Sequence, residues 1–241
     1  MKIEIDTHSH TLVSGHAYNT IREMAHMAAE KGLKGLAVTE HAPKMPGSAG
    51  LYYFQNLRAV PRQMYGIRLL LGVELNIMDG EGTLDLPESV IEELDISIAS
   101  IHPPCFGGER TKEVVTETYL NVMKKSCVDI IGHPDDGRFP VDYDVLAKEA
   151  KRTGTLLEVN NASLSPGGFR RDTHDNAKRM LECCKKYGTM VVAATDAHVD
   201  VSIAEYLYVQ KVLEEVDFPE ELVANASLEK LCSSLKRNKK A

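Results

Sequence analysis

Short apolar segments alternate with longer amphipathic segments along almost the whole chain. Each apolar segment is mostly unbroken and rich in Val, Ile and Leu, which is typical of strands that are buried on both faces. Seven segments fit this description. They predict strands over residues 3–6, 35–39, 68–73, 96–100, 128–132, 156–160 and 190–195.

Helical patterns fill most of the intervals between these segments. The expected helices cover residues 19–31, 54–64, 87–93, 112–125, 142–152, 173–186 and 203–214, with a last one near 219–235. Regular alternation of strand and helix is typical of parallel βαβ units. Seven such units in a chain of 241 residues predict one α/β domain with a closed or nearly closed barrel.

The loops differ between the two ends of the predicted strands. Connections that enter a strand are short, and several carry a glycine just past a helix end, as at Gly32, Gly66, Gly154 and Gly188. Connections that leave a strand are long and rich in turn residues, over 42–50, 103–110, 134–140 and 162–172. Long loops at the carboxyl ends of the strands are typical of the active-site face of a barrel.

Composition narrows the class of protein. The net charge of −7 and the pI near 5.7 argue against non-specific binding to nucleic acid or to a membrane surface. No apolar run is long enough to span a membrane and the N-terminus lacks a signal-peptide pattern, so a cytoplasmic location is expected. The five cysteines show no C-x-x-C spacing and are expected to be reduced thiols, with Cys105 notable because it follows a histidine in a Pro/Gly loop.

Potential metal ligands follow six of the seven predicted strands. They are His8, His10, His41, Glu74, His102, His133, Asp196 and His198, with His16 in the loop after the first strand. In the pairs His8/His10 and Asp196/His198 the two side chains are two positions apart, so they point to the same side and can converge on one site. Imidazole and carboxylate together suit zinc, manganese or iron. By contrast, His26 and His174 fall on helices and are not expected to be ligands.

The motifs around these residues resemble the PHP (polymerase and histidinol phosphatase) superfamily, most closely its YcdX-like phosphatase branch. The matching segments are residues 6–10 (DTHSH), 39–43 (TEHAP), 72–76 (GVELN), 100–102 (SIH), 132–134 (GHP), 158–161 (EVNN) and 195–198 (TDAH). They cover nearly the whole chain in the right order. The resemblance implies a distorted (β/α)7 TIM-like barrel as a single domain over residues 1–241, with a C-terminal helix and a basic tail from about 219.

The resemblance also implies a trinuclear metal centre. One divalent ion would take His8, His10, Glu74 and Asp196, a second Glu74, His102 and His133, and a third His16, His41 and His198. Zinc is the favoured metal, with manganese and iron as alternatives. Glu74, as the bridging carboxylate, Asp196 and His198 would then be the catalytic residues.

A site of this kind favours phosphate-ester hydrolysis. A hydroxide held between two ions would attack phosphorus, while the third ion would offset the developing charge. We expect a phosphomonoesterase that acts on a small phosphorylated metabolite. The alternatives are a nucleotide phosphatase or nuclease, a histidinol-phosphate phosphatase, and a metal-binding regulatory module without activity.

Residues near the sixth strand are candidates for binding the substrate phosphate. They are Asn160, Asn161, Arg170 and Arg171, and weaker candidates in other loops are Lys44, Arg110 and Arg138. The basic run over 236–240 is expected to be a solvated tail. Long nucleic acid and membranes are not expected as partners. A homo-oligomer is compatible with the sequence, which leaves the oligomeric state open.

Overall fold

The computed structural model describes residues 1–240 and forms a nearly closed parallel barrel. Its parallel strands follow the order β1-β2-β4-β5-β6-β7-β8. Their bounds are Ile5–Asp6, Gly35–His41, Ile67–Asn76, Ile96–Ser100, Ile130–Ile131, Leu156–Asn160 and Val191–Ala194. The predicted single-domain (β/α)7 TIM-like barrel is confirmed, although β1 and β6 are only two residues long.

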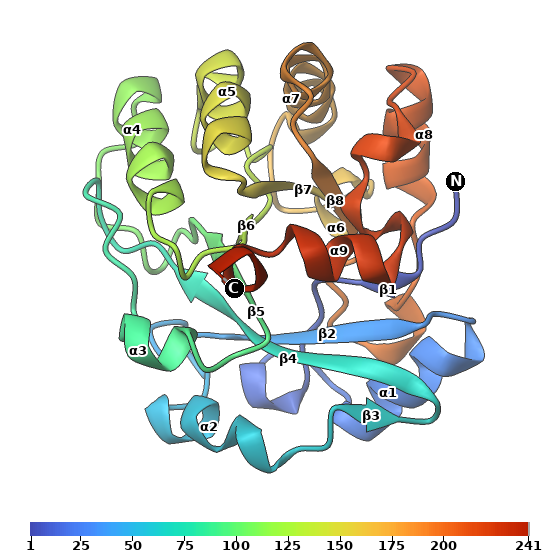
Figure 1. Cartoon of the computed structure of the whole chain (residues 1–241). Coiled ribbons are helices and arrows are strands. Elements are labelled where there is room, and N and C mark those ends of the chain that lie inside the picture. The colour runs from blue at the N-terminus through green and yellow to red at the C-terminus, as the bar shows by residue number, and fades with distance from the viewer. Residues whose placement is uncertain (241) are drawn as a thin grey trace.

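Amphipathic helices cover the outside of the barrel. Figure 1 shows α4, α5, α7 and α8 in a row along one side, and α1 and α2 on the other. The helices are α1 (Ile21–Glu30), α2 (Leu51–Asn56), α3 (Glu88–Ile91), α4 (Lys112–Met123), α5 (Tyr143–Thr153), α6 (Asn161–Leu164), α7 (Thr173–Tyr187), α8 (Leu207–Glu215) and α9 (Leu228–Ser234). Among residues 1–240, none of these helices is both long and apolar enough to cross a membrane.

The helix predicted over 54–64 is wrong. Helix α2 begins earlier and ends at Asn56, and a 3₁₀ turn at Leu57–Ala59 follows it. Pro61 has no N–H to continue a helix, and Gln63–Met64 instead forms the short strand β3, antiparallel to β4. The turn between them contains Tyr65 and Gly66, both at positive φ, which is the conformation that tight hairpins require.

The C-terminal region also differs from the prediction. The helix expected near 219–235 is reduced to α9, after two 3₁₀ turns at Glu220–Leu222 and Ala224–Ala226. The run over 236–240 is not a solvated tail at its start, because Lys236 is buried and donates to the carbonyl oxygen of Met123. Arg237 forms an ion pair with Asp129, whose side chain is fully buried. Burial of an unpaired carboxylate is costly. The ion pair removes this cost and so holds the segment against the barrel.

The gap between β8 and β1 is closed by side chains and single bridges rather than by a continuous ladder. Buried Asn225 donates from Nδ2 to the carbonyl oxygens of Ile5 and Ala193, and its Oδ1 accepts from the N–H of Ala193. Nearer the carboxyl ends, Ser9 and Ala197 form a parallel bridge. These contacts satisfy the edge groups that an open sheet would expose.

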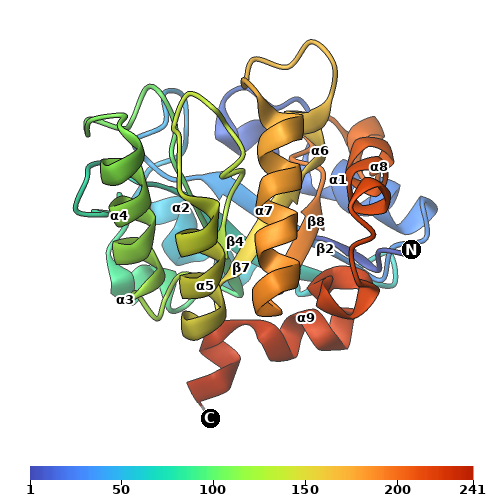
Figure 2. The same ribbon diagram turned by 90° about the horizontal axis from the view of Figure 1, so that it is seen from above.

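The barrel interior is filled with aliphatic side chains at its amino-terminal end. They include Ile5, Ala37, Leu70, Ile98 and Val192, and Leu231 and Leu235 of the C-terminal segment pack against them. In Figure 2, α9 lies across one end of the barrel, and the loop before α7 rises at the opposite end. Since one end is filled and covered, only the carboxyl end of the strands is open for a site.

Candidate metal centre

Strand register brings the predicted ligands to the carboxyl end of the barrel. His41 at the end of β2 pairs with Glu74 in the neighbouring strand β4, and His102 comes just after the next strand, β5. His133 follows β6 with a φ of 28°, and Asp196 follows β8 with a φ of 56°. L residues rarely adopt positive φ, and such strained residues are concentrated at functional sites.

Glu74 lies at the centre of the cluster. Its carboxylate oxygens are within 3.5 Å of a ring nitrogen from each of five histidines: His8 at 3.3 Å, His10 at 3.5 Å, His41 at 2.7 Å, His102 at 3.1 Å and His133 at 3.0 Å. The Glu74 side chain is only 1% exposed. This carboxylate is therefore in contact with imidazoles from four different strand ends, as a bridging group must be.

Asp196 and the remaining histidines extend the cluster toward the barrel mouth. Asp196 Oδ1 lies 3.3 Å from Nε2 of His10 and 3.6 Å from Nδ1 of His198. The ring of His16 is exposed, and its centroid is 4.9 Å from the rings of both His41 and His198. All nine residues predicted as ligands thus lie in one contiguous group.

The donor atoms of this group fit metal ions better than they fit each other. Nδ1 of His41 and Oε2 of Glu74 are buried 2.7 Å apart, yet neither has a hydrogen-bond partner. Nε2 of His8 and Nε2 of His10 face each other at 3.0 Å. The potential ligand atoms form three sets, and within each set all of them lie within 4.8 Å of one another. The sets are His8/His10/Glu74, His10/His41/His198 and His41/Glu74/His102. Buried unpaired donors that converge in this way are expected where a cation belongs.

An outer layer of hydrogen bonds orients the imidazoles. Nδ1 of His8 contacts Glu158 Oε1 at 2.6 Å, Nδ1 of His10 contacts Ser14 Oγ at 3.0 Å, and Nδ1 of His102 contacts Asn76 Oδ1 at 2.7 Å. In each ring Nε2 is left to face the cluster. Such contacts fix the tautomer and orientation of metal-binding histidines.

Sequence reasoning assigned no role to Glu158, Ser14 or Asn76. One signal was available for Glu158, because a charged residue stood between the apolar residues Leu157 and Val159 in the middle of a strand. Its Oε2 also accepts from the backbone N–H of His133, at 2.7 Å. Glu158 therefore orients two predicted ligands at once.

Electrostatics keeps the carboxylates ionised and favours neutral rings at His10, His16 and His102. His8 is the exception, because burial is outweighed by Glu158 and Glu74, which raise its pKa well above the ordinary value in the absence of metal. Burial opposes the charge on Glu74, but His102, His8 and His41 outweigh it and hold the pKa of Glu74 well below its usual range. Burial, with His41 and His198 nearby, lowers the pKa of His10 well below the ordinary value for histidine. Neutral imidazole and ionised carboxylate are the forms that bind metal.

The four predicted phosphate-binding residues divide into two pairs. Asn160 is buried and donates to Asp196 Oδ2 at 3.2 Å, and Arg170 donates to the same oxygen at 3.1 Å. Asn161 instead accepts from the N–H groups of Tyr208 and Val209 at the start of α8. Arg171 is exposed and contacts Asp136 through its backbone N–H. The structure therefore brings Asn160 and Arg170 to the cluster, but not Asn161 or Arg171.

A cavity of about 480 Å³ opens onto the cluster. Its lining residues are His16, His41, Met45, His102, Pro103, Pro104, Arg138, Ala162, Phe169, Arg170, Asp196 and His198. Lys44 and Arg110 are not among them. This volume suits one small organic ligand.

The other residues singled out in the sequence lie away from the centre or are unreactive near neutral pH. His26 is 57% exposed beside Glu30, and His174 contacts Glu215. Cys105 is buried, and burial raises the pKa of its thiol to about 11. A thiol of such high pKa is not a nucleophile near neutral pH.

Comparison with known proteins identifies the family. Residues 6–164 match the PHP domain. A protein of Acetivibrio thermocellus described as a probable phosphatase is 43% identical over 239 residues, covering 99% of this chain and 98% of its own length. A probable phosphatase of Clostridium acetobutylicum is 42% identical, with 98% and 96% coverage. The chain belongs to the PHP family.

Solved structures share the fold at low identity. Histidinol phosphate phosphatase of Lactococcus lactis, in a complex with zinc, L-histidinol and phosphate, matches with a TM-score of 0.65 and 19% identity, over 91% of this chain and 95% of that one. A chain of an archaeal ribonuclease P structure matches with a TM-score of 0.61 and 16% identity, over 98% and 91%. These likenesses establish the barrel architecture.

Proposed function

We propose that the chain is a metal-dependent phosphoesterase, and more narrowly a phosphomonoesterase that hydrolyses a small phosphorylated metabolite. The observation that carries this proposal is the convergence of seven histidines and the Asp196 carboxylate around Glu74 at the base of a small open cavity. Relatives over 40% identical along almost the full chain, described as probable phosphatases, support it.

We assign three divalent ions to the centre, with zinc favoured. The ligand sets are those implied by family resemblance: His8, His10, Glu74 and Asp196; Glu74, His102 and His133; and His16, His41 and His198. When bound, such ions would polarise the phosphate and lower the pKa of a water. The oxygen–nitrogen donor set suits zinc, and a protein with this fold is described with zinc.

The protein's own groups hold and orient the ester. Arg170 lines the cavity beside the centre, where two of its N–H groups donate to Asp196 and to Ser163 Oγ, the latter at 2.9 Å. A guanidinium has five N–H groups, so others can donate to phosphoryl oxygens. Asn160 offers an amide beside it. In hydrolysis a water oxygen bonds to phosphorus, the bond from phosphorus to the ester oxygen breaks, and a proton ends on the released alcohol.

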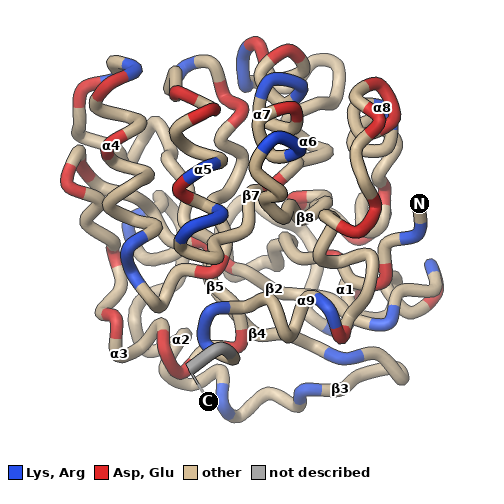
Figure 3. The backbone as a smooth tube through the Cα atoms, turned by 45° about the horizontal axis from the view of Figure 1, so that its top comes forward, with Lys and Arg blue, Asp and Glu red and all other residues tan. Residues whose placement is uncertain are grey.

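The alternatives fit the structure less well. Figure 3 shows basic and acidic residues interspersed over the outer helices, and the net charge is −7, which does not favour long nucleic acid. A silent metal-binding module would not need a cavity over its metal centre. Nucleotides and histidinol phosphate remain within the range of small esters that the cavity could hold. We also propose a cytoplasmic location.

A hydrolysis screen tests the proposed function. Metal-replete protein is assayed with phosphomonoesters, phosphodiesters and nucleotides, and we expect turnover of monoesters. His198→Ala should lower kcat/KM about a hundredfold, because it removes a ligand of the third ion. His26→Ala, on an exposed helix position, is the matched control and should leave the rate unchanged. Activity on diesters alone would refute the phosphomonoesterase proposal. Full activity of His198→Ala would refute its role as a ligand of the third ion.

Arg170→Ala should weaken substrate binding. Loss of a charge-assisted donor to phosphate is expected to raise KM roughly tenfold or more. Arg170→Lys should retain only part of the substrate affinity, because lysine lacks the planar guanidinium and its paired N–H groups. Arg171→Ala is the control, since its side chain is exposed and lies outside the cavity lining. Equal effects of Arg170→Ala and Arg171→Ala on KM would argue against this role.

A further inference from the structure

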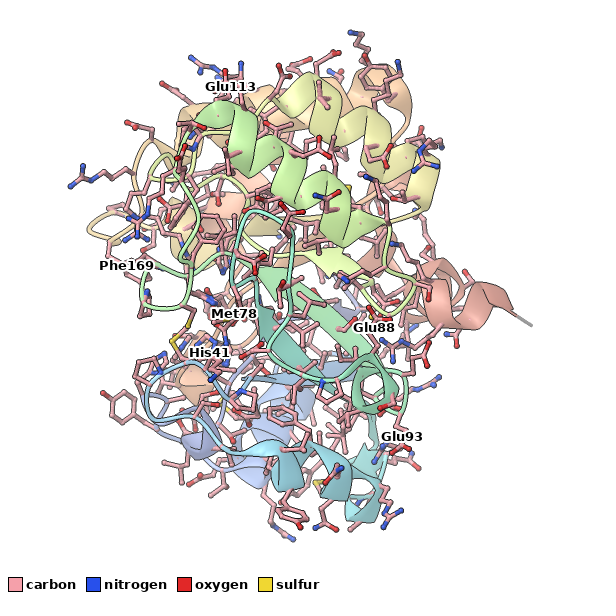
Figure 4. All side chains as sticks on the ribbon, turned by 90° about the vertical axis from the view of Figure 1, so that its left-hand side faces the viewer. His41, Met78, Glu88, Glu93, Glu113 and Phe169 are labelled. Atoms are coloured by element: carbon pink, nitrogen blue, oxygen red, sulfur yellow. The ribbon has the colours of Figure 1, made fainter. Side chains whose placement is uncertain are left out.

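Phe169 presents an exposed aromatic ring at the mouth of the cavity. It lies in the loop between α6 and α7, lines the cavity, and is 72% exposed. In Figure 4, Phe169 and His41 lie on the same side of the molecule, away from Glu88 and Glu93. A large apolar side chain left exposed beside a reactive centre is a candidate ligand contact.

Two guanidinium groups hold this ring in place. The guanidinium carbons of Arg138 and Arg170 lie 5.2 and 5.1 Å from the ring centroid. Each arginine is anchored in turn, Arg138 through Nε to Asp136 at 2.9 Å and Arg170 to Asp196 at 3.1 Å. The ring therefore has a defined position although most of its surface is open.

The rest of the outer cavity wall is apolar. Away from the metal cluster it consists of Met45, Pro103, Pro104, Ala162 and the Phe169 ring. The only polar side chains in this part of the described lining are the two guanidiniums, which already face carboxylates. A leaving group rich in hydroxyls would lose hydrogen bonds to water here and find few replacements.

The position of the ring limits the distance between phosphate and leaving group. Arg170 contacts Asp196 of the cluster with one N–H, and its guanidinium carbon lies over the Phe169 ring, 5.1 Å from the centroid. One side chain thus separates the ring from the proposed metal centre. A group attached to the ester oxygen directly or through one carbon would reach it.

We propose that Phe169 and the apolar wall form a leaving-group subsite that selects phosphomonoesters of planar aromatic or heteroaromatic groups. The proposal rests on the proposed phosphatase function and adds its substrate class. Aromatic rings pack favourably on one another by offset stacking or edge-to-face contact. The cavity has room for one such ring beside a phosphate, at about 480 Å³.

Binding of non-hydrolysable phosphonates tests the subsite without turnover. Calorimetry on the metal-replete protein compares benzylphosphonate with methylphosphonate. Phe169→Ala should raise the Kd of benzylphosphonate about tenfold and change that of methylphosphonate less than about twofold. Phe169→Tyr should preserve the preference, whereas Phe169→Leu, which keeps apolar bulk but not the flat ring, should lose most of it. Tyr52→Ala is the control, because Tyr52 is an 88% exposed aromatic outside the cavity lining.

Hydrolysis gives the second readout. The ratio of kcat/KM for phenyl phosphate to that for glycerol 3-phosphate should fall about tenfold in Phe169→Ala, and intrinsic ester reactivity cancels because each ratio is compared with the wild type. If Phe169→Ala left the preference for the aromatic ligand unchanged, or weakened both ligands equally, the subsite would be overturned. The proposed function would still stand as long as the protein hydrolyses phosphomonoesters. Aromatic preference that depends on Phe169 in a protein without phosphatase activity would support the subsite and overturn the function.

Discussion

Replacing Glu74 with glutamine should lower kcat roughly a thousandfold or more and reduce the metal content of the purified protein. Glutamine keeps the size of the side chain but removes its charge and one strong ligand oxygen. The five imidazoles around this carboxylate would then face a neutral amide. Paired assays of phosphatase rate and metal content, measured by mass spectrometry on the same sample, check this expectation.

The control for this experiment is Glu40→Gln. Glu40 is also a buried carboxylate at the same end of the barrel, but it accepts from Thr11 and Ser14 and is not a predicted ligand. Because Glu40 reaches the centre only through Ser14 and His10, we expect a much smaller loss of rate and of bound metal than in Glu74→Gln. If Glu74→Gln kept both its rate and its metal content, Glu74 would not be a bridging ligand.

Replacing Arg237 with methionine should destabilise the fold by about 3 kcal/mol, because it leaves a buried carboxylate without its charged partner. Asp129 is fully buried, and its Oδ2 accepts from Nη2 of Arg237 at 2.6 Å and from the N–H of Ser97 at 3.0 Å. Methionine retains most of the apolar stem. Chemical denaturation would give the free energy of unfolding.

A surface ion pair provides the comparison for Arg237. Arg152 contacts Glu149 at 2.6 Å, but its side chain is 65% exposed, so Arg152→Met should leave the free energy of unfolding almost unchanged. The double variant Arg237→Met with Asp129→Asn should recover part of the loss, since the buried charge is then gone. If Arg237→Met were as stable as the wild type, the ion pair would not hold the segment, and the prediction of a solvated tail would be correct.

The strand positions and the ligand cluster could be predicted from the sequence for the same physical reason. Buried parallel strands form apolar runs, and their carboxyl ends meet at one face. Residues placed two apart at a strand end, such as His8 and His10, must then point to a common side. Local sequence therefore carried most of the information about the fold and about which residues converge.

Features that depend on contacts distant in sequence could not be predicted in this way. The contact between Glu158 and His8 spans 150 residues, and that between Arg237 and Asp129 spans 108. Nor does the sequence distinguish Arg170 from Arg171, since only the path of the loop decides which side chain turns inward. The helical pattern over 54–64 also gave a wrong prediction, because Pro61 and a tight turn favour a hairpin in its second half.

Metal stoichiometry tests the central claim most directly. The protein is purified without chelator, and metal is measured per chain by inductively coupled plasma mass spectrometry, with positions from anomalous diffraction. The trinuclear assignment predicts about three equivalents of divalent metal, bound among the residues around Glu74. One equivalent or none, in protein that hydrolyses phosphomonoesters at full rate, would contradict it.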